Sequence, residues 1–142
     1  MELIVRPVDV NYLAQTWPLV KEFLAAALAT IDAPEDTHCY NIHHVQAFIT
    51  NEQWLLTVIV DKDSKIQGAI TVSFVNYPNQ RVAFVTLCGG KSIANKDVLK
   101  QLSDICRMYG ATKLQAYANG SRLRLWEKTG FKKHTTLIGV DL

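Results

Sequence analysis

Three apolar, β-branched runs follow one another in the middle of this chain, and they constrain its fold more than any other feature. The runs are 53–60 (QWLLTVIV), 66–75 (IQGAITVSFV) and 81–88 (RVAFVTLC). Each has the length and composition of a strand, and the segments DKDSK and YPNQ between them are short and polar, as turns are. Strands joined by such short turns run antiparallel. The sequence therefore predicts an antiparallel three-strand meander at the centre of the fold.

Helical periodicity flanks the meander on both sides. Before it, apolar residues recur at three- and four-residue steps between a cap at Asn11 and Ala29, and a second helix is expected over 39–50. After it, Asn95 and Gly110 are the expected cap and stop of an amphipathic helix. The remaining elements are strands over 3–8, 112–118 and 131–142 and a short helix that stops at Gly130. The predicted order is β-α-α-β-β-β-α-β-α-β, an α/β fold with a mixed sheet.

The composition is that of one globular domain spanning residues 1–142. At 142 residues, with 49% apolar and 20% charged residues, the chain is long enough for one mixed core. No apolar run approaches bilayer length and the start lacks the features of a signal peptide, so we expect a cytoplasmic protein with no membrane partner. Cys39, Cys88 and Cys106 are odd in number and widely spaced, which argues against disulfides and a zinc cluster. We expect them to be small buried hydrophobes.

Charge is unevenly distributed along the chain. Residues 1–88 hold five Lys/Arg against nine Asp/Glu, whereas residues 89–142 hold ten against four. An anionic partner would therefore be drawn to the second half, and both a nucleotide cofactor and a solvated basic face without a partner satisfy this pattern. Nucleic acid is not expected, because the basic residues from Arg122 to Lys133 are not interleaved with aromatic side chains on an exposed sheet. The histidines at 38, 43 and 44 lack a supporting carboxylate pair, so no metal site is expected.

Residues 119–131 carry the most specific signal. Asn119 follows a strand, residues 125–131 (LWEKTGF) close the next helix, and Gly130 permits the left-handed turn that returns Phe131 to the core. With the order of elements, this segment resembles the GCN5-related N-acetyltransferase superfamily, in which an asparagine opens the fourth helix and an aromatic-Glu-Lys-x-Gly-Phe pattern closes it. The resemblance implies a sheet that splays open between the strands 81–88 and 112–118, with helices on both faces. It also implies acetyl-coenzyme A as the cofactor and acetyl transfer to an amine on a small molecule or protein.

The same resemblance implies a site at the splay. Strand amides from Thr86 to Gly89 would meet the pantetheine arm, and the helix that starts near Asn95 would face the pyrophosphate, because helix N-termini favour anions. Tyr117, at the end of the strand 112–118, is the candidate catalytic acid. The candidate cofactor-binding residues are Leu87, Cys88, Gly89, Gly90, Lys91, Ser92 and Asn119.

The sequence departs from the superfamily in three places. Gly90, Ile93 and Asn95 do not match the pattern of the pyrophosphate loop. Trp126 stands where many members have a tyrosine as acid, and an indole N–H cannot protonate a thiolate at neutral pH. Residues 66–88 contain no Asp or Glu that would serve as a base. These departures leave open a catalytically inactive copy of the fold, used as a structural or protein-binding module.

A narrower resemblance favours that alternative. The stretch from CGGKSI at residue 88 to the TGF that ends at Phe131 is similar to small proteins encoded by tailed bacteriophages, in which this fold has an eroded cofactor loop. Some of those proteins are virion components. This resemblance implies a protein partner in a phage particle, in place of a cofactor and a substrate.

Overall fold

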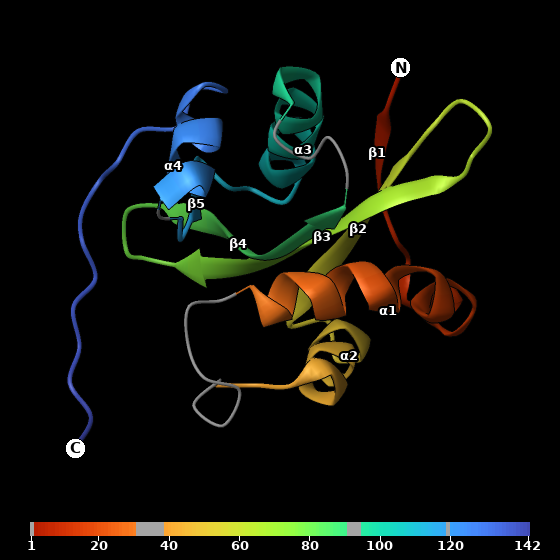
Figure 1. Cartoon of the computed structure of the whole chain (residues 1–142), viewed down its shortest axis with the longest axis horizontal. Helices are drawn as coiled ribbons and strands as arrows, with labels where there is room; N and C mark the ends of the chain where they lie inside the picture. Colours follow the sequence, from red (N-terminus) through yellow and green to blue (C-terminus); the bar gives the residue numbers. More distant parts are fainter. Residues whose placement is uncertain (1, 31–38, 91–94, 119) are drawn as a thin grey trace.

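A five-stranded sheet forms the centre of the computed structural model, which describes residues 2–30, 39–90, 95–118 and 120–142 (Figure 1). The strands are β1 (Ile4–Pro7), β2 (Trp54–Val60), β3 (Ile66–Asn76), β4 (Arg81–Gly90) and β5 (Lys113–Ala116). The helices are the 3-10 turn η1 (Val10–Tyr12), α1 (Leu13–Ala29), α2 (Ile42–Thr50), α3 (Lys96–Met108) and α4 (Gly120–Glu127). The predicted α/β class with a mixed sheet is confirmed.

The strands of the sheet lie in the order in which they occur along the chain, β1-β2-β3-β4-β5. The first four pair antiparallel, so β2, β3 and β4 form the predicted meander. β5 pairs parallel with β4, after the chain has crossed over through α3. A parallel neighbour requires such a crossover, because a tight turn can only reverse the chain.

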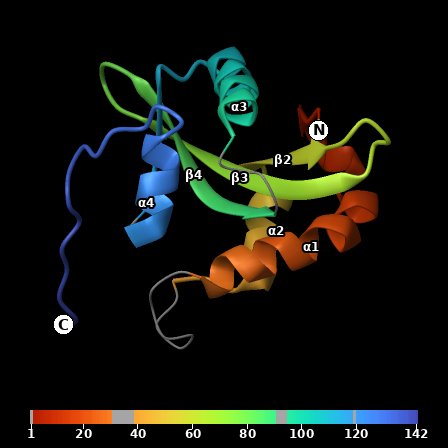
Figure 2. The ribbon, with the colours of Figure 1, turned by 45° about the horizontal axis from the view of Figure 1, so that its top comes forward.

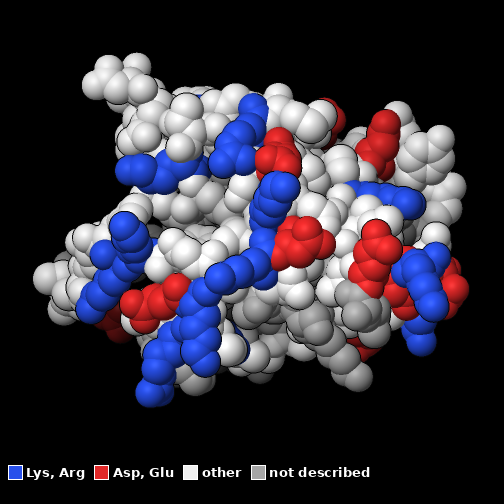
Figure 3. All heavy atoms as spheres, turned by 90° about the horizontal axis from the view of Figure 1, so that it is seen from above, with Lys and Arg blue, Asp and Glu red and all other residues white. Residues whose placement is uncertain are grey.

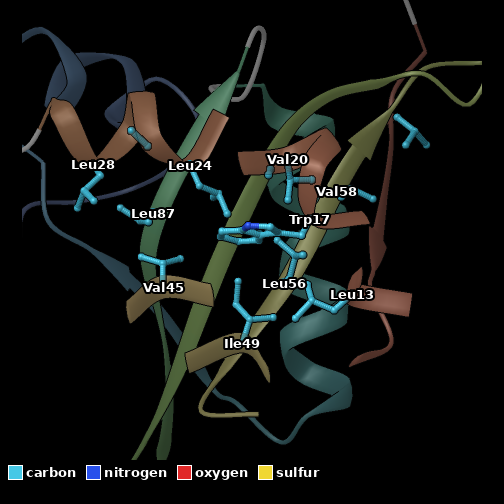
Figure 4. Close-up of a cluster of buried hydrophobic side chains, with 13 residues drawn as sticks. Leu13, Trp17, Val20, Leu24, Leu28, Val45, Ile49, Leu56, Val58 and Leu87 are labelled. Atoms are coloured by element: carbon cyan, nitrogen blue, oxygen red, sulfur yellow. The ribbon is translucent and has the colours of Figure 1, made fainter. Parts of the chain in front are cut away.

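Two hydrophobic cores lie on opposite faces of the sheet. α1 and α2 cover one face, where Trp17 and Leu24 of α1 meet Leu56 of β2 and Leu87 of β4 (Figure 4). α3 covers the other face and packs Val98, Leu102, Ile105 and Cys106 against Ile59, Ile70, Val72 and Val85. Among the described residues, no helix is both long and apolar enough to cross a membrane.

A β-bulge interrupts the pairing of β3 with β4. Thr71 pairs with Leu87 and Val72 with Val85, so Thr86 is an extra residue on β4. Side chains alternate between the two faces of a strand, and one extra residue shifts that alternation. Val85 accordingly packs in the core under α3, whereas Leu87 packs in the core under α1.

The expected helix ends are correct for α3 and wrong for α1. The Asn95 side chain caps α3, and Gly110, with φ of 89°, ends it in the left-handed region that favours glycine. Asn11 is not a cap: the Asp9 side chain accepts its N–H, and α1 begins at Leu13 after the turn η1. The apolar periodicity that predicted the helix does not reveal a short capped turn in front of it.

The expected final strand over 131–142 is also wrong. The structure has no strand or helix in this stretch, and every residue from Lys132 onward is exposed. A strand needs a hydrogen-bonding neighbour, and local β preference alone does not supply one. The predicted strand over 112–118 is real but shorter, because its pairing with β4 ends at Ala116.

Candidate functional site

β5 pairs with β4 along its whole length, but it covers only part of β4. Their register runs from Val82 opposite Lys113 to Val85 opposite Ala116, whereas β4 continues to Gly90. Beyond Val85, no described strand pairs with the edge of β4 that faces away from β3. The pairing stops at the bulge because β5 ends there, and this leaves the predicted opening beside the rest of β4. We call this opening along residues 86–90 the notch.

The two glycines at the end of β4 have a packing role that the sequence did not reveal. A Cβ on Gly89 would lie 2.1 Å from the main-chain oxygen of Phe23, so α1 rests directly on this residue. A Cβ on Gly90 would lie 2.4 Å from the oxygen of Gln67, and its φ of 121° also favours glycine. Both glycines are thus required by neighbouring backbone. Close approach to a cofactor stays a prediction.

The start of α3 is less open to an anion than expected. Asn95 Oδ1 accepts the main-chain N–H groups of Asp97 and Val98 at 2.8 and 3.2 Å. These are two of the amides that a phosphate would use at a helix N-terminus. The Asp97 carboxylate, in the first turn of the helix, adds a negative charge at the same end. The sequence identified Asn95 as the cap, but it did not show that this side chain competes with an anion for the same amides.

Tyr117, the candidate acid, lies just beyond the end of β5. Its side chain is 71% exposed, and its ring meets Phe84 of β4 edge-on, with the ring centroids 4.8 Å apart. Phe84 is two residues before the bulge, so the tyrosine stands at the end of the notch where β4 and β5 part. No structural observation assigns a proton to its hydroxyl, and its catalytic role stays a prediction.

Two threonine hydroxyls meet at the bulge, and the sequence analysis missed them. Thr71 Oγ1 of β3 and Thr86 Oγ1 of β4 lie 2.7 Å apart, within hydrogen-bond distance. Thr71 is fully buried, whereas Thr86 is half-buried and lies where the notch begins. In the sequence the two threonines are fifteen positions apart, and each looks like an ordinary sheet former. Only the register of β3 and β4 shows that they pair.

Arg122 of α4 is a further residue whose contacts the sequence analysis missed. Its Nη1 donates to the main-chain oxygen of Thr30, at the end of α1, over 3.4 Å. Its positive charge also acts on the Cys88 thiol of β4, although burial dominates and raises the pKa of that thiol to about 12. Arg122 therefore links α4 to the end of α1 and lies close enough to Cys88 of β4 for its charge to act on that thiol. Figure 2 shows α4 beside β4. In the sequence, Arg122 is only one cation of a basic stretch.

Exposed cations surround this side of the molecule. Figure 3 views it from above and shows Lys and Arg side chains in a stripe across the surface. The exposed basic residues of α3, α4 and the segment after them are Lys96, Lys100, Arg107, Arg122, Arg124, Lys128, Lys132 and Lys133. Among the described residues, the one ion pair joins Arg107 to Asp104 at 2.9 Å. Most of this charge is thus left for solvent or for an anionic partner.

A hollow of about 440 Å³ lies at the end of the sheet where β4 begins, away from the notch. Arg81 is part of its wall, with its guanidinium 4.4 Å from the centre of the Phe74 ring, and Tyr109 stacks on the same ring. Arg81 precedes Thr86 by five positions on β4, a separation of about 17 Å along a strand. The hollow is therefore separate from the notch.

Several expected residues cannot be placed. Lys91, Ser92 and Asn119 lie outside the described residues, as does His38. His44 is engaged locally, because its Nδ1 accepts the N–H of Asn41, which caps α2. Within the part of the chain that the structure describes, no three His, Cys, Asp or Glu side chains gather as metal ligands would.

Comparisons with known proteins identify the fold. No family model matches the sequence, and no curated protein does. A solved aminoglycoside acetyltransferase from an uncultured soil metagenomic sample, in complex with sisomicin, is 11% identical with a TM-score of 0.71 over 99% of this chain and 95% of that one. Glucosamine-6-phosphate N-acetyltransferase from Arabidopsis thaliana is 14% identical, with a TM-score of 0.61 over 99% of each chain. A predicted acetyltransferase from Clostridium acetobutylicum, solved with acetyl-CoA, is 12% identical, with a TM-score of 0.63 over 99% of this chain and 96% of that one.

These likenesses extend over whole chains, so the fold of this protein is that of acetyltransferases. At such low identity they establish the fold and leave the chemistry to the residues of the site. The resemblance recognised in residues 119–131 is confirmed at the level of the fold.

Proposed function

We propose that this chain, which has the fold of the GCN5-related N-acetyltransferase superfamily, binds an acyl-coenzyme A in the notch and transfers its acetyl group to an amine. The observation that carries the proposal is the partial pairing of β4, which ends at Val85 while the strand runs on to Gly90. Main-chain amides on an unpaired strand edge need hydrogen-bond partners. The amide groups of an extended pantetheine arm are suitable partners for them.

The residues of β4 would hold the cofactor mainly through their main chain. Leu87, Cys88, Gly89 and Gly90 line the free edge, and Lys91, Ser92 and Asn119 are proposed to contact it from the flanking segments. Acetyl-coenzyme A, when bound, supplies the acetyl group as an activated thioester. The buried Cys88 thiol, with its pKa raised to about 12, stays protonated at neutral pH and therefore does not compete as a nucleophile.

Proton transfer would depend on few groups of the chain. The Tyr117 hydroxyl is proposed to donate a proton to the leaving thiolate, because it stands at the parting of β4 and β5. Residues 66–88 offer no carboxylate as a base, so the acceptor amine would have to lose its proton to water. We therefore expect slow transfer. An acceptor of small-molecule or protein origin is equally compatible with the notch.

A second candidate is a protein-binding module that keeps the fold and does not transfer acetyl groups. Arg122 favours it, because this side chain is held at Thr30 and acts on Cys88, one of the residues proposed to hold the cofactor. The capped start of α3, with Asp97 in its first turn, favours it as well. Such a module would have a protein partner and would not respond to acetyl-coenzyme A.

Thermal melting with and without acetyl-coenzyme A separates the two candidates. A ligand at a hundredfold excess over its dissociation constant should stabilise the folded state by about 2.7 kcal/mol, which raises the melting temperature by several degrees. The shift should disappear in Lys91→Glu, because the substitution places a negative charge where the phosphates are proposed to lie. Lys62→Glu is the matched control, since Lys62 is an exposed residue of the turn between β2 and β3.

Both outcomes are informative. A shift that Lys91→Glu abolishes and Lys62→Glu preserves supports a cofactor in the notch, and acetylation of an amine can then be sought by mass spectrometry. No shift at a saturating concentration of acetyl-coenzyme A would overturn the first candidate and leave the second. A shift that survives Lys91→Glu would show that the phosphates lie elsewhere.

A further inference from the structure

The hollow at the start of β4 has the size and the lining of a small-molecule site. Its volume of about 440 Å³ lies within the range of about 300–1,000 Å³ that is typical of such pockets. The aromatic rings of its wall belong to Trp54, Phe74 and Tyr109. Its charged residues are Asp9, Glu52 and Arg81. The rest of the lining is aliphatic, so the hollow combines a largely apolar wall with a few groups that would orient a ligand.

Arg81 leaves part of its guanidinium without a partner. The group is held over the Phe74 ring, 4.4 Å from its centre, and Tyr109 stacks on that ring. Its Nη1 donates to Asn76 Oδ1 at 2.8 Å, whereas its Nε is buried and has no hydrogen-bond partner among the described residues. Nε and Nη2 together form a fork that matches the two oxygens of a carboxylate. A carboxylate on a ligand would therefore satisfy a donor that the protein itself leaves unpaired.

Glu52 occupies a backbone conformation that favours glycine. It lies two residues after the end of α2 with φ of 58°, in the left-handed region, and its N–H donates to the Ile49 oxygen at 3.0 Å. A glutamate in this conformation is strained, and strain of this kind gathers at functional sites. The residue is exposed and belongs to the wall of the hollow, where its carboxylate is available to a cation.

The charges of the wall restrict the kind of ligand that fits. Among the described residues that line the hollow, Arg81 is the one cation, and neither Asp9 nor Glu52 forms an ion pair with it. A ligand with a carboxylate or phosphate alone would face two charges of its own sign. An added ammonium group turns that repulsion into attraction. Asp9 Oδ1 already accepts the N–H of Asn11 at 2.8 Å, so we assign the ammonium to Glu52.

We propose that the hollow at the start of β4 binds a free amino acid with an apolar or aromatic side chain. The carboxylate of the ligand takes the Nε–Nη2 fork of Arg81, its ammonium group faces Glu52, and its side chain lies on the apolar part of the wall. The hollow is separate from the notch, so this site does not depend on what the notch binds.

The first test is the binding of L-phenylalanine to the full chain, measured by calorimetry and by NMR. We expect a dissociation constant below about 1 mM, with the amide shifts grouped at residues 52–56 and 74–81. Phenylpropionate lacks the ammonium group and phenethylamine lacks the carboxylate. Each should bind at least about tenfold more weakly than L-phenylalanine, because each leaves one charged group of the wall unpaired.

Two substitutions, each with a matched control, test the assigned contacts. Arg81→Lys should weaken the binding of L-phenylalanine at least about tenfold, because lysine keeps the charge and lacks the fork. Arg124→Lys makes the same exchange at an exposed position of α4 and should leave binding unchanged.

Glu52→Gly keeps the test independent of any loss of folding. It removes the carboxylate and relieves the left-handed backbone, so it should weaken binding about three- to tenfold while the melting temperature stays unchanged or rises. Ser64→Gly is its control, because Ser64 has φ of 62° in the turn between β2 and β3 and the substitution relieves the same kind of strain. This control should bind L-phenylalanine as the original chain does.

Three results would overturn the proposal. If neither L-phenylalanine nor L-leucine binds at about 10 mM, the hollow is not an amino-acid site. If phenylpropionate binds as tightly as L-phenylalanine, the site selects an anion and the role of Glu52 is wrong. If Arg81→Lys and Glu52→Gly both bind L-phenylalanine as their controls do, the ligand lies on another surface.

Discussion

Replacing Gly89 with alanine tests whether this glycine serves packing or cofactor binding. In the structure, a Cβ at this position would lie 2.1 Å from the Phe23 oxygen and 2.9 Å from its carbonyl carbon. Ordinary contact begins near 3.4 Å, so α1 and β4 would have to separate by about an ångström, and both contacting atoms belong to backbone that cannot rotate away.

The expected loss of stability follows from two opposing terms. Gly89 does not have a positive φ, so alanine would by itself stabilise the protein by about 0.4–1 kcal/mol through the unfolded state. Overpacking of a rigid interior costs about 1–3 kcal/mol, and contact with main chain places this site at the upper end. We therefore expect Gly89→Ala to lower the free energy of unfolding by about 2 kcal/mol.

Urea denaturation measures this change directly. Gly139→Ala is the control, because a Cβ there would meet nothing within 4 Å and should change stability by less than about 0.5 kcal/mol. A Gly89→Ala variant as stable as the original would refute the close approach of α1 to β4. An equally stable variant that also lost the acetyl-coenzyme A melting shift would instead show that Gly89 is needed for the cofactor.

Three further predictions concern Arg122, Tyr117 and the two cysteines with raised pKa values. Arg122→Ala should tighten acetyl-coenzyme A binding about two- to fivefold in calorimetry, because it removes a weak hydrogen bond that the ligand would have to break. Arg124→Ala is the control: it removes the same charge from α4 and should not tighten binding. Tyr117→Phe should lower the rate constant of acetyl transfer at least about tenfold with little change in cofactor affinity, and an unchanged rate would remove this residue from the mechanism. The raised pKa values of Cys88, about 12, and Cys106, about 11, mean that these thiols ionise in the unfolded chain first, so stability should fall as pH rises above 9. Urea denaturation at pH 7 and pH 10 checks this, and a Cys88→Ala variant should show a smaller fall.

Local signals predicted much of the fold. Asn95 and Gly110 mark the ends of α3 because capping and left-handed glycine are properties of a few neighbouring residues. The meander was also predicted, from its short turns, and the opening beside the end of β4 was predicted from the resemblance. The final strand failed because a strand depends on a partner, and none of the described residues provides one for 131–142.

The details of the candidate site depend on strand register and tertiary contacts, which the sequence does not show. Thr86 looks like any strand residue until the register shows that it is the extra residue of the bulge. Arg122 looks like one cation in a basic stretch, and only the packing of α4 brings it to Thr30, ninety-two positions away in the chain. Gly89 was singled out for proximity to a ligand, which stays a prediction, whereas the structure shows its proximity to α1.

The bulge makes β4 tolerant of one particular deletion. If Thr86 were removed, Val85 and Leu87 would become neighbours, and the ordinary alternation of a strand would keep them on opposite faces. Leu87 would stay opposite Thr71, and the bare Gly89 would still lie against the α1 backbone. A residue inserted after Leu87 would instead turn the end of the strand over and bring the Cys88 side chain to that backbone, where only a glycine fits.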